Sequence, residues 1–234
     1  MCGRYAAARD AADLAIWCEA ERLPATDLRP RYNVAPTSEA YLVVDEEGTR
    51  SIDIAKWGLI PSWSRDAGHA SRMINARSET VAVKPAYRSA FKRRRCLVPV
   101  DGYYEWQANG TAARTPKQPF YIHERNGDPL ALAGLFEDWA GPDGPVRTFS
   151  VLTQDASGWL QRIHDRMPVI IERESWSTWL DGPLTDEAFA SIVEGSRDDA
   201  PHLLEAHPVS TRVNKAGNEG ADLIEPIGPA LNVG

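Results

Sequence analysis

The feature of this sequence that most constrains its fold is a succession of short apolar segments between residues 96 and 171, divided by turn signals. Asn-Gly occurs at residues 109–110 and again at 126–127, and Pro-Asp-Gly occurs at 142–144. Such sequences favour the tight turns that join antiparallel strands. We therefore predict short strands throughout this region, at residues 96–100, 119–124, 130–138, 147–153 and 167–171.

The flanking regions supply one further hairpin and a few helices. Residues 40–45 and 51–57 read as two strands joined by Glu-Glu-Gly at 46–48. Apolar residues at helical spacing predict helices at residues 8–21, 84–94 and 185–206, the last of them acidic, and a helical turn at 159–164. Two stretches rich in proline and glycine, residues 30–38 and 57–63, are predicted to be loops, and the second would present Trp57 and Trp63.

Many short strands with few helices indicate an α+β fold, with a curved and mainly antiparallel sheet or barrel as its core. A hydrophobic content of 43% and eight Trp residues are sufficient for a substantial core. The sequence has no internal repeat and no long linker, so we expect residues 1–234 to form a single domain.

Composition also excludes several classes of protein. No apolar segment of a secretory signal follows residue 1, and no run of about 18 apolar residues occurs, so we expect a cytoplasmic protein without a membrane span. The three cysteines, Cys2, Cys18 and Cys96, form no Cys-x-x-Cys pair. We therefore expect neither disulfides, metal nor cofactor, and a monomer because no oligomerising segment is visible.

The net charge of −7 conceals a strongly basic stretch. Residues 72–95 contain eight Lys or Arg residues and one acidic residue, Glu79, which gives +7 for this stretch and −14 for the rest. Such polarity suits binding of a polyanion at one face, although a solvated basic helix would give the same pattern.

The first five residues, Met-Cys-Gly-Arg-Tyr, suggest a specific chemistry. Aminopeptidases remove an initiator Met when the next residue is small, so we expect Cys2 to become the first residue. It would then carry a thiol with a pKa of about 8.5 beside an α-amine with a pKa of about 8. An aldehyde can form an imine with this amine, and the thiol can close on the imine carbon to give a thiazolidine. The alternative is an incidental Cys at a frayed terminus.

Three polar residues lie among apolar ones. Glu105 follows a predicted buried strand, where desolvation would raise its pKa and suit proton transfer at neutral pH. His164 precedes the predicted strand at 167–171, and imidazole titrates near physiological pH. Asn75 can donate and accept hydrogen bonds without charge. The alternatives are a Glu paired with an arginine, a structural His and an Asn that caps a turn.

Taken together, these segments resemble the SRAP family (SOS response-associated peptidases; abasic-site processing proteins). Eight motifs carry the resemblance in order: Met-Cys-Gly-Arg-Tyr at 1–5, Arg-Tyr-Asn-Val-Ala-Pro at 31–36, Trp-Gly-Leu-Ile-Pro at 57–61, Asn-Ala-Arg-Ser-Glu-Thr at 75–80, Arg-Cys-Leu-Val-Pro at 95–99, Gly-Tyr-Tyr-Glu-Trp at 102–106, Ala-Gly-Leu at 133–135 and His-Asp-Arg-Met-Pro at 164–168.

The resemblance implies that Cys2 forms a covalent thiazolidine with the aldehyde of an abasic site in single-stranded DNA and shields it from cleavage, with possible reversal. It implies that Asn75 positions the lesion and Cys2, and that Glu105 and His164 transfer protons. It further implies contacts to DNA phosphates and bases, by Arg4, Arg77, Arg166, Trp106 and the 57–63 loop with Trp63.

Two other functions remain open from the sequence. The older family label describes a thiol autopeptidase, which would use Cys2 as nucleophile and His164 as base. A non-catalytic module could bind single strands through aromatic residues and arginines. The basic stretch favours DNA over a peptide substrate, and only the crosslinking hypothesis requires both nucleophiles of a terminal Cys2.

Overall fold

The structure is a computed structural model that describes residues 2–108 and 116–231. Its strands are β1 (Tyr5–Ala7), β2 (Arg31–Val34), β3 (Glu39–Glu46), β4 (Thr49–Trp57), β5 (Asn75–Arg77), β6 (Arg95–Val100), β7 (Gly102–Gln107), β8 (Gln118–Glu124), β9 (Leu130–Gly141), β10 (Gly144–Asp155), β11 (Arg166–Pro168) and β12 (Leu204–Pro208). Its α-helices are α1 (Ala11–Cys18), α2 (Arg88–Arg93), α3 (Trp176–Leu180) and α4 (Asp186–Leu203). Short 3₁₀ turns are η1 (Ala70–Arg72), η2 (Gly158–Arg162), η3 (Arg173–Ser175), η4 (Thr211–Asn214) and η5 (Ala221–Leu223).

Five strands close into a barrel. β3 pairs with β4 and β6, β6 pairs with β9, β9 pairs with β10, and β10 pairs in parallel with β4. All contacts in this ring except β4–β10 are antiparallel. The predicted α+β class with a curved, mainly antiparallel barrel core is therefore confirmed, as are the hairpin at 46–48 and the turn at 142–144. The turn predicted at 109–110 lies outside the described residues.

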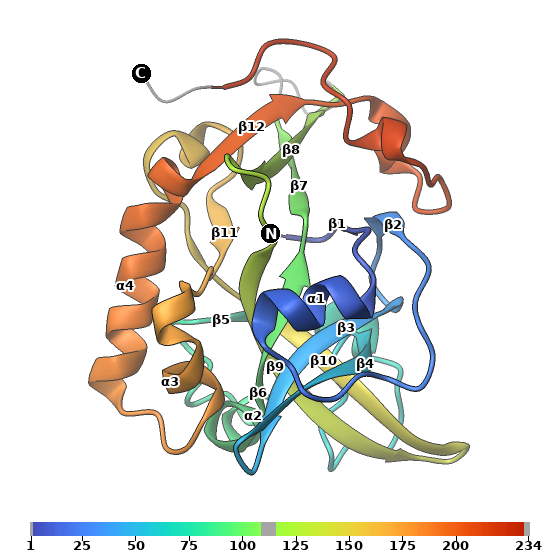
Figure 1. The fold of residues 1–234 in the computed structure, drawn as a ribbon, viewed down its shortest axis with the longest axis vertical. Coiled ribbons are helices and arrows are strands. Elements are labelled where there is room, and N and C mark those ends of the chain that lie inside the picture. The colour runs from blue at the N-terminus through green and yellow to red at the C-terminus, as the bar shows by residue number, and fades with distance from the viewer. Residues whose placement is uncertain (1, 109–115, 232–234) are drawn as a thin grey trace.

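A second sheet of five antiparallel strands, in the order β12-β8-β7-β1-β2, crosses the upper part of the view in Figure 1. Chain segments from both ends contribute to it, because β1 pairs with β7 and β12 pairs with β8. This arrangement brings residues 2–5 into the middle of the molecule and buries Cys2 completely.

β6 illustrates how the barrel separates two apolar cores. Cys96, Val98 and Val100 belong to a core cluster that also contains Cys2 and Tyr5, whereas Leu97 belongs to a second cluster with residues of α1, α2 and α3. Side chains of a strand alternate between faces, and here both faces are covered, so the strand reads as a continuous apolar run.

The two helices in the first half of the chain, α1 and α2, are shorter than predicted. α1 begins after Asp10, whose carboxylate accepts from the amide of Asp13, and it ends at Cys18, where the next residue, Glu19, has a φ of 58°, so it covers less than residues 8–21. The helix predicted at 84–94 is limited to Arg88–Arg93, and the residues before it form turns in which the amides of Tyr87 and Arg88 donate to the carbonyl of Lys84. α4 confirms the acidic helix near the C-terminal end. Within the described residues, no helix combines the length and apolar character needed to cross a bilayer.

Two predicted loops are partly wrong. The stretch 30–38 contains β2, because residues 31–34 pair with β1. Trp57 ends β4 and is fully buried, with its Nε1 donating to the carbonyl of Ile74 at 3.0 Å and its ring stacked on Phe149. Trp57 is therefore a core residue and presents no surface to a ligand.

Candidate functional site

The pairing of β1 with β7 determines which side chains surround Cys2. Tyr5 lies opposite Tyr103, and the amide of Tyr104 donates to the carbonyl of Arg4 at 2.9 Å. Because side chains alternate along a strand, Tyr103 and Glu105 lie on one face of β7, and Tyr104 lies on the other. Tyr5 and Tyr103 share a core cluster with Cys2, whereas Tyr104 belongs to a separate cluster.

Asn75 reaches Cys2 from β5, which pairs in parallel with β10. The Nδ2 atom of Asn75 donates to the carbonyl oxygen of Cys2 at 2.7 Å. The backbone carbonyl of Asn75 accepts from the hydroxyl of Tyr87 at 3.1 Å. The buried Oδ1 of Asn75 has no hydrogen-bond donor among the described residues. Asn75 thus binds the Cys2 backbone, and its Oδ1 remains as an acceptor.

Glu105 lies on β7 with only 4% of its side chain exposed. Burial raises its pKa from 4.5 to about 7, because an apolar environment disfavours the charged form. Its Oε2 lies 3.9 Å from Nε2 of His164. The rise in pKa agrees with the expectation for a buried carboxyl group, and the role of Glu105 in proton transfer stays a prediction.

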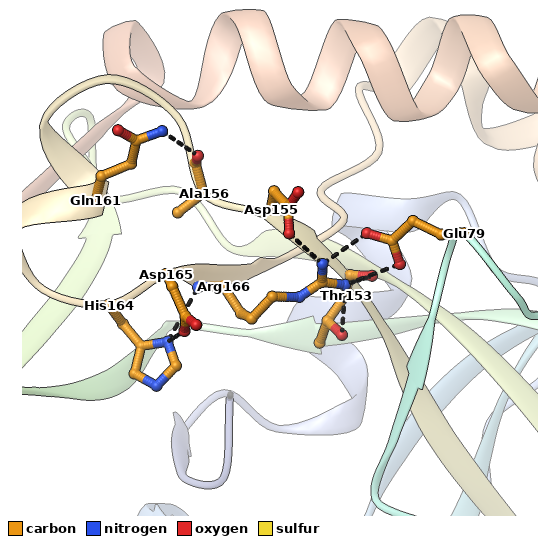
Figure 2. Close-up of polar contacts among 8 residues, drawn as sticks. All are labelled: Glu79, Thr153, Asp155, Ala156, Gln161, His164, Asp165 and Arg166. Carbon is orange, nitrogen blue, oxygen red and sulfur yellow. Dashed lines mark hydrogen bonds and ion pairs between the residues drawn. The ribbon is translucent and has the colours of Figure 1, made fainter.

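His164 follows η2 and precedes β11, and 25% of its side chain is exposed. Burial lowers its pKa from 6.5, while the negative charge of Asp165 acts in the opposite direction. Figure 2 shows that its Nδ1 faces two groups, the backbone amide of Arg166 at 3.0 Å and the carboxylate of Asp165 at 2.8 Å. Burial therefore acts in opposite directions on the two pKa values and favours the neutral forms of both Glu105 and His164.

The thiol of Cys2 differs from an exposed thiol. Burial raises its pKa well above the ordinary value, and the negative charge of Glu105 adds to the effect. The expected pKa of about 8.5 is therefore wrong for the folded chain. Reaction of this thiol requires a neighbouring group that accepts its proton.

The three predicted phosphate ligands have different environments. The side chain of Arg77 is exposed and forms no hydrogen bond or ion pair with other described residues, so its guanidinium is available to a ligand. Arg4 is half-buried and donates to Oδ1 of Asn33 at 2.8 Å and to the carbonyl of Val213 at 2.9 Å.

Arg166 is held by protein groups. Only 7% of its side chain is exposed, and its guanidinium contacts the carboxylates of Glu79 at 2.6 Å and Asp155 at 2.5 Å, as well as the carbonyl of Thr153 at 2.7 Å (Figure 2). Two carboxylates already offset its single positive charge, so Arg166 has the environment of a structural anchor for β11.

The basic stretch at 72–95 is divided by the fold. Arg95 is buried and donates to backbone carbonyls, including those of Phe91 and Trp179, and Arg94 pairs with the buried Glu137 at 2.7 Å. The remaining six cations are exposed: Arg72, Arg77, Lys84, Arg88, Lys92 and Arg93. The prediction of a basic surface therefore applies to these six residues, only three of which lie on α2.

The aromatic candidates also differ. Trp63 is 67% exposed, and Trp106 is half-buried with its Nε1 donating to Oδ1 of Asn214 at 2.7 Å. Trp106 packs against the cluster that contains Tyr104, so it lies on the face of β7 opposite to Glu105. Trp63 is therefore the more accessible of the two indoles.

Sequence reasoning missed several residues of this site. Tyr5 and Tyr103 carry buried hydroxyls with no hydrogen-bond partner among the described residues, and their charged forms would interact with Cys2. Tyr103 could have been predicted, because side chains alternate along a strand and Tyr103 therefore lies on the same face as Glu105. Asn33, which is fully buried and bonded to Arg4, and Asp165, which contacts His164, gave no signal beyond their polarity.

Four segments distant in the sequence thus place a cysteine, an amide, a carboxylic acid and an imidazole around one buried position, and the described residues contain no cluster suited to a metal ion. An α+β barrel with a buried cysteine at position 2, close to a buried carboxylic acid and an imidazole, describes the class of protein. The chain belongs to the SOS response associated peptidase (SRAP) family, whose family model matches residues 1–216.

Named relatives cover nearly the whole chain. The chain is 33% identical to the abasic site processing protein YoqW of Bacillus subtilis over 227 residues, covering 96% of this chain and 99% of YoqW. It is 31% identical to the abasic site processing protein YedK of Escherichia coli over 231 residues, covering 97% of this chain and 100% of YedK. With the abasic site processing protein HMCES of Gallus gallus it shares 30% identity, covering 97% of this chain and 78% of that protein.

Solved structures support the same fold. A crystal structure of a protein from Bacteroides thetaiotaomicron superimposes with a TM-score of 0.80 at 23% identity, covering 96% of this chain and 99% of that one. A phage-related protein from Bordetella bronchiseptica superimposes with a TM-score of 0.68 at 30% identity, covering 90% of this chain and 95% of that one.

Proposed function

We propose that this protein acts on abasic sites in single-stranded DNA, and that Cys2, freed by removal of Met1, forms a covalent thiazolidine with the ring-opened sugar. The observation that carries the proposal is the set of contacts around the buried Cys2: Asn75 binds its carbonyl oxygen, the charge of Glu105 acts on its thiol, and His164 lies 3.9 Å from Glu105. The names of the relatives, which are abasic site processing proteins, agree with this substrate.

The chemistry balances without a cofactor. The α-amine of Cys2 adds to the aldehyde carbon of the open sugar, and loss of one water gives an imine. The thiol then adds to the imine carbon, its proton passes to the ring nitrogen through a neighbouring base, and the five-membered ring closes. The net reaction joins protein and DNA with release of one water, and reversal requires that water to return.

The surrounding side chains have matching roles. Glu105, with a pKa of about 7, accepts a proton from the thiol, whose own raised pKa prevents spontaneous ionisation. His164 supplies and recovers a proton as the sugar ring opens and the imine forms or breaks. Asn75 fixes the Cys2 backbone through the 2.7 Å hydrogen bond, so the two nucleophiles approach the aldehyde in a defined geometry.

DNA binding is assigned to the exposed groups. Arg77 lies two residues after Asn75 on β5 and has no competing partner in the described chain, so it is placed to bind a phosphate beside the lesion. Trp63 offers an exposed surface for base stacking. Arg4, Arg166 and Trp106 have protein partners, so any contact that they make with DNA uses their remaining exposed atoms.

The test is a reaction of the protein with single-stranded DNA that carries one abasic site, followed by intact mass spectrometry and denaturing gels. We expect an adduct at the mass of protein plus DNA minus one water, absent with Cys2→Ala and absent with undamaged DNA. Protein confirmed by mass to begin at Cys2 that gives no adduct would overturn the proposal.

A second candidate function is peptide-bond cleavage by the Cys2 thiol with Glu105 or His164 as base. It is favoured by the same buried proton acceptor beside the thiol and by the family description as a peptidase. In this case the protein would release Met1 itself, and Cys2→Ala would retain Met1 in a host lacking methionine aminopeptidase activity. Release of Met1 from Cys2→Ala at the normal rate would exclude the autopeptidase function.

A further inference from the structure

The Nδ1 atom of His164 has two neighbours of opposite hydrogen-bonding character. The backbone amide of Arg166 can only donate to it, at 3.0 Å, and the carboxylate of Asp165 can only accept from it when ionised, at 2.8 Å (Figure 2). A neutral imidazole carries one proton on one of its two nitrogens. The two neighbours therefore favour different protonation states of the same ring.

The amide is the fixed partner. Arg166 begins β11, which pairs with β10 at Asp155, and its guanidinium is held by Glu79 and Asp155. The amide of Ala156 also donates to the backbone carbonyl of Asp165 at 2.9 Å, which fixes the turn from the other side. The Arg166 amide can neither move away nor give up its proton.

The carboxylate is the mobile partner. The Asp165 side chain is 86% exposed, so it can turn toward water whenever Nδ1 lacks a proton. Its backbone stays in place through the bond from Ala156. The carboxylate can return to Nδ1 when the ring becomes charged.

We propose that the Arg166 amide holds neutral His164 in the tautomer protonated at Nε2, and that Asp165 is a positioning residue that pairs with Nδ1 of the imidazolium. The Nε2 atom lies on the side of Glu105, at 3.9 Å from Oε2. His164 consequently presents a proton toward the buried carboxylate in both of its charge states. Only the imidazolium, which carries a second proton, can give a proton up to a neighbouring base, because a neutral imidazole keeps its N–H near neutral pH.

Among the described residues, the charges of Asp165, on the turn itself, and Lys117, just before β8, act on the pKa of His164, and the carboxyl group of Glu105 on β7 lies 3.9 Å from Nε2. Of these, Asp165 is the one that contacts Nδ1. Removing its charge should disfavour the imidazolium and leave the neutral tautomer unchanged, because the Arg166 amide remains.

The test is nuclear magnetic resonance of the imidazole nitrogens in ¹⁵N-labelled protein, titrated from about pH 5 to pH 9. The signals of His164 are identified by their loss in His164→Gln. In the neutral ring we expect Nε2 to be protonated and Nδ1 to be unprotonated. In Asp165→Asn we expect the same tautomer and a pKa lower by about 0.5 unit, as for a partly exposed ion pair.

Two further variants complete the test. Asp165→Glu should restore a pKa close to that of the unsubstituted protein, and Asp143→Asn, in the exposed turn between β9 and β10, should have no effect on His164. A neutral ring protonated at Nδ1, or an unchanged pKa in Asp165→Asn, would overturn the inference. Only its catalytic consequence rests on the proposed function, since the tautomer is measured in free protein and stands or falls independently of DNA crosslinking.

Discussion

The side-chain amide of Asn75 donates a 2.7 Å hydrogen bond to the carbonyl oxygen of Cys2, across 73 positions of sequence. β5 pairs with β10 of the barrel, so this bond attaches the N-terminal segment to the barrel wall. The position of the proposed nucleophile is thus set by a strand that belongs to another part of the chain.

Loss of this bond should slow crosslinking. In Asn75→Ala the Cys2 carbonyl loses a donor, at a cost of about 1.4 kcal/mol, which corresponds to about a tenfold lower rate. The measurement is the single-turnover rate of adduct formation with abasic single-stranded DNA. Asn126→Ala, in the exposed turn after β8, is the control and should react at the normal rate. Equal rates for the two variants would remove Asn75 from the positioning of Cys2.

The raised pKa of Glu105 predicts a specific pH dependence of stability. The folded state binds the Glu105 proton more tightly than the unfolded state, so this contribution is complete below about pH 4.5 and is lost as the pH rises through about 7. Glu105→Gln remains neutral throughout. Its free energy of unfolding relative to the unsubstituted protein should therefore increase between these two pH values, by at most about 3 kcal/mol.

Denaturant unfolding of both proteins at several pH values measures this difference. The lowered pKa of His164 contributes with the opposite sign, since its stabilisation is present above pH 6.5 and is lost at lower pH. That contribution is common to the two proteins. Parallel stability curves between pH 4.5 and 7 would show that Glu105 is charged in the folded protein.

Arg77 and Arg166 should respond differently to replacement. Arg77→Ala should leave the melting temperature unchanged and weaken binding to any single-stranded DNA, with a salt dependence shallower by about 0.7 in the log–log slope. Arg166→Ala should destabilise the protein by about 1–3 kcal/mol, because two carboxylates lose their cation, a cost moderated by their exposure. Thermal unfolding and fluorescence anisotropy separate the two effects.

A suitable control for Arg77 is Arg197→Ala, an exposed arginine on the acidic helix α4. It should alter neither the DNA affinity nor the salt slope. If Arg197→Ala and Arg77→Ala weakened binding equally, the affinity would reflect total charge and the assignment of Arg77 to the DNA path would be rejected.

Two adjacent tyrosines on β7 provide an internally matched stability test. The Tyr103 hydroxyl is buried without a partner among the described residues, so Tyr103→Phe should leave the free energy of unfolding unchanged or raise it. The Tyr104 hydroxyl donates to the carbonyl of Tyr32 at 2.7 Å, so Tyr104→Phe should lose about 1 kcal/mol, or about 2–4 °C in melting temperature. A larger loss in Tyr103→Phe than in Tyr104→Phe would reveal a hidden partner of Tyr103.

Trp63 and Trp57 should likewise differ. Trp63→Ala should cost less than about 0.5 kcal/mol of stability and reduce affinity for single-stranded DNA by about 1–3 kcal/mol if a base stacks on it. Trp57→Ala should cost about 3–5 kcal/mol of stability, because the ring is fully buried against Tyr5 and Phe149. Undiminished DNA binding by a folded Trp63→Ala protein would exclude this indole from the DNA path.

Local patterns in the sequence predicted the main elements well. The alternation and turn residues of β3–β4 and β9–β10 act between neighbouring residues, so the hairpins were predictable to within a few positions. Cys2, Asn75, Glu105 and His164 were also named from the sequence as candidate site residues, by motif and by chemical character. These properties depend on residue type and near neighbours alone.

Burial and pairing depended on the whole fold. Trp57, Arg95 and Arg166 look like surface ligands in a linear sequence, yet the closed barrel covers Trp57 and Arg95 and the contact with Glu79 and Asp155 engages Arg166. The sequence by itself determined the strands, the turns and the reactive groups. Only the tertiary structure decided which of those groups meet, because β-ladders join distant segments, and which are charged, because pKa values follow the burial that those ladders create.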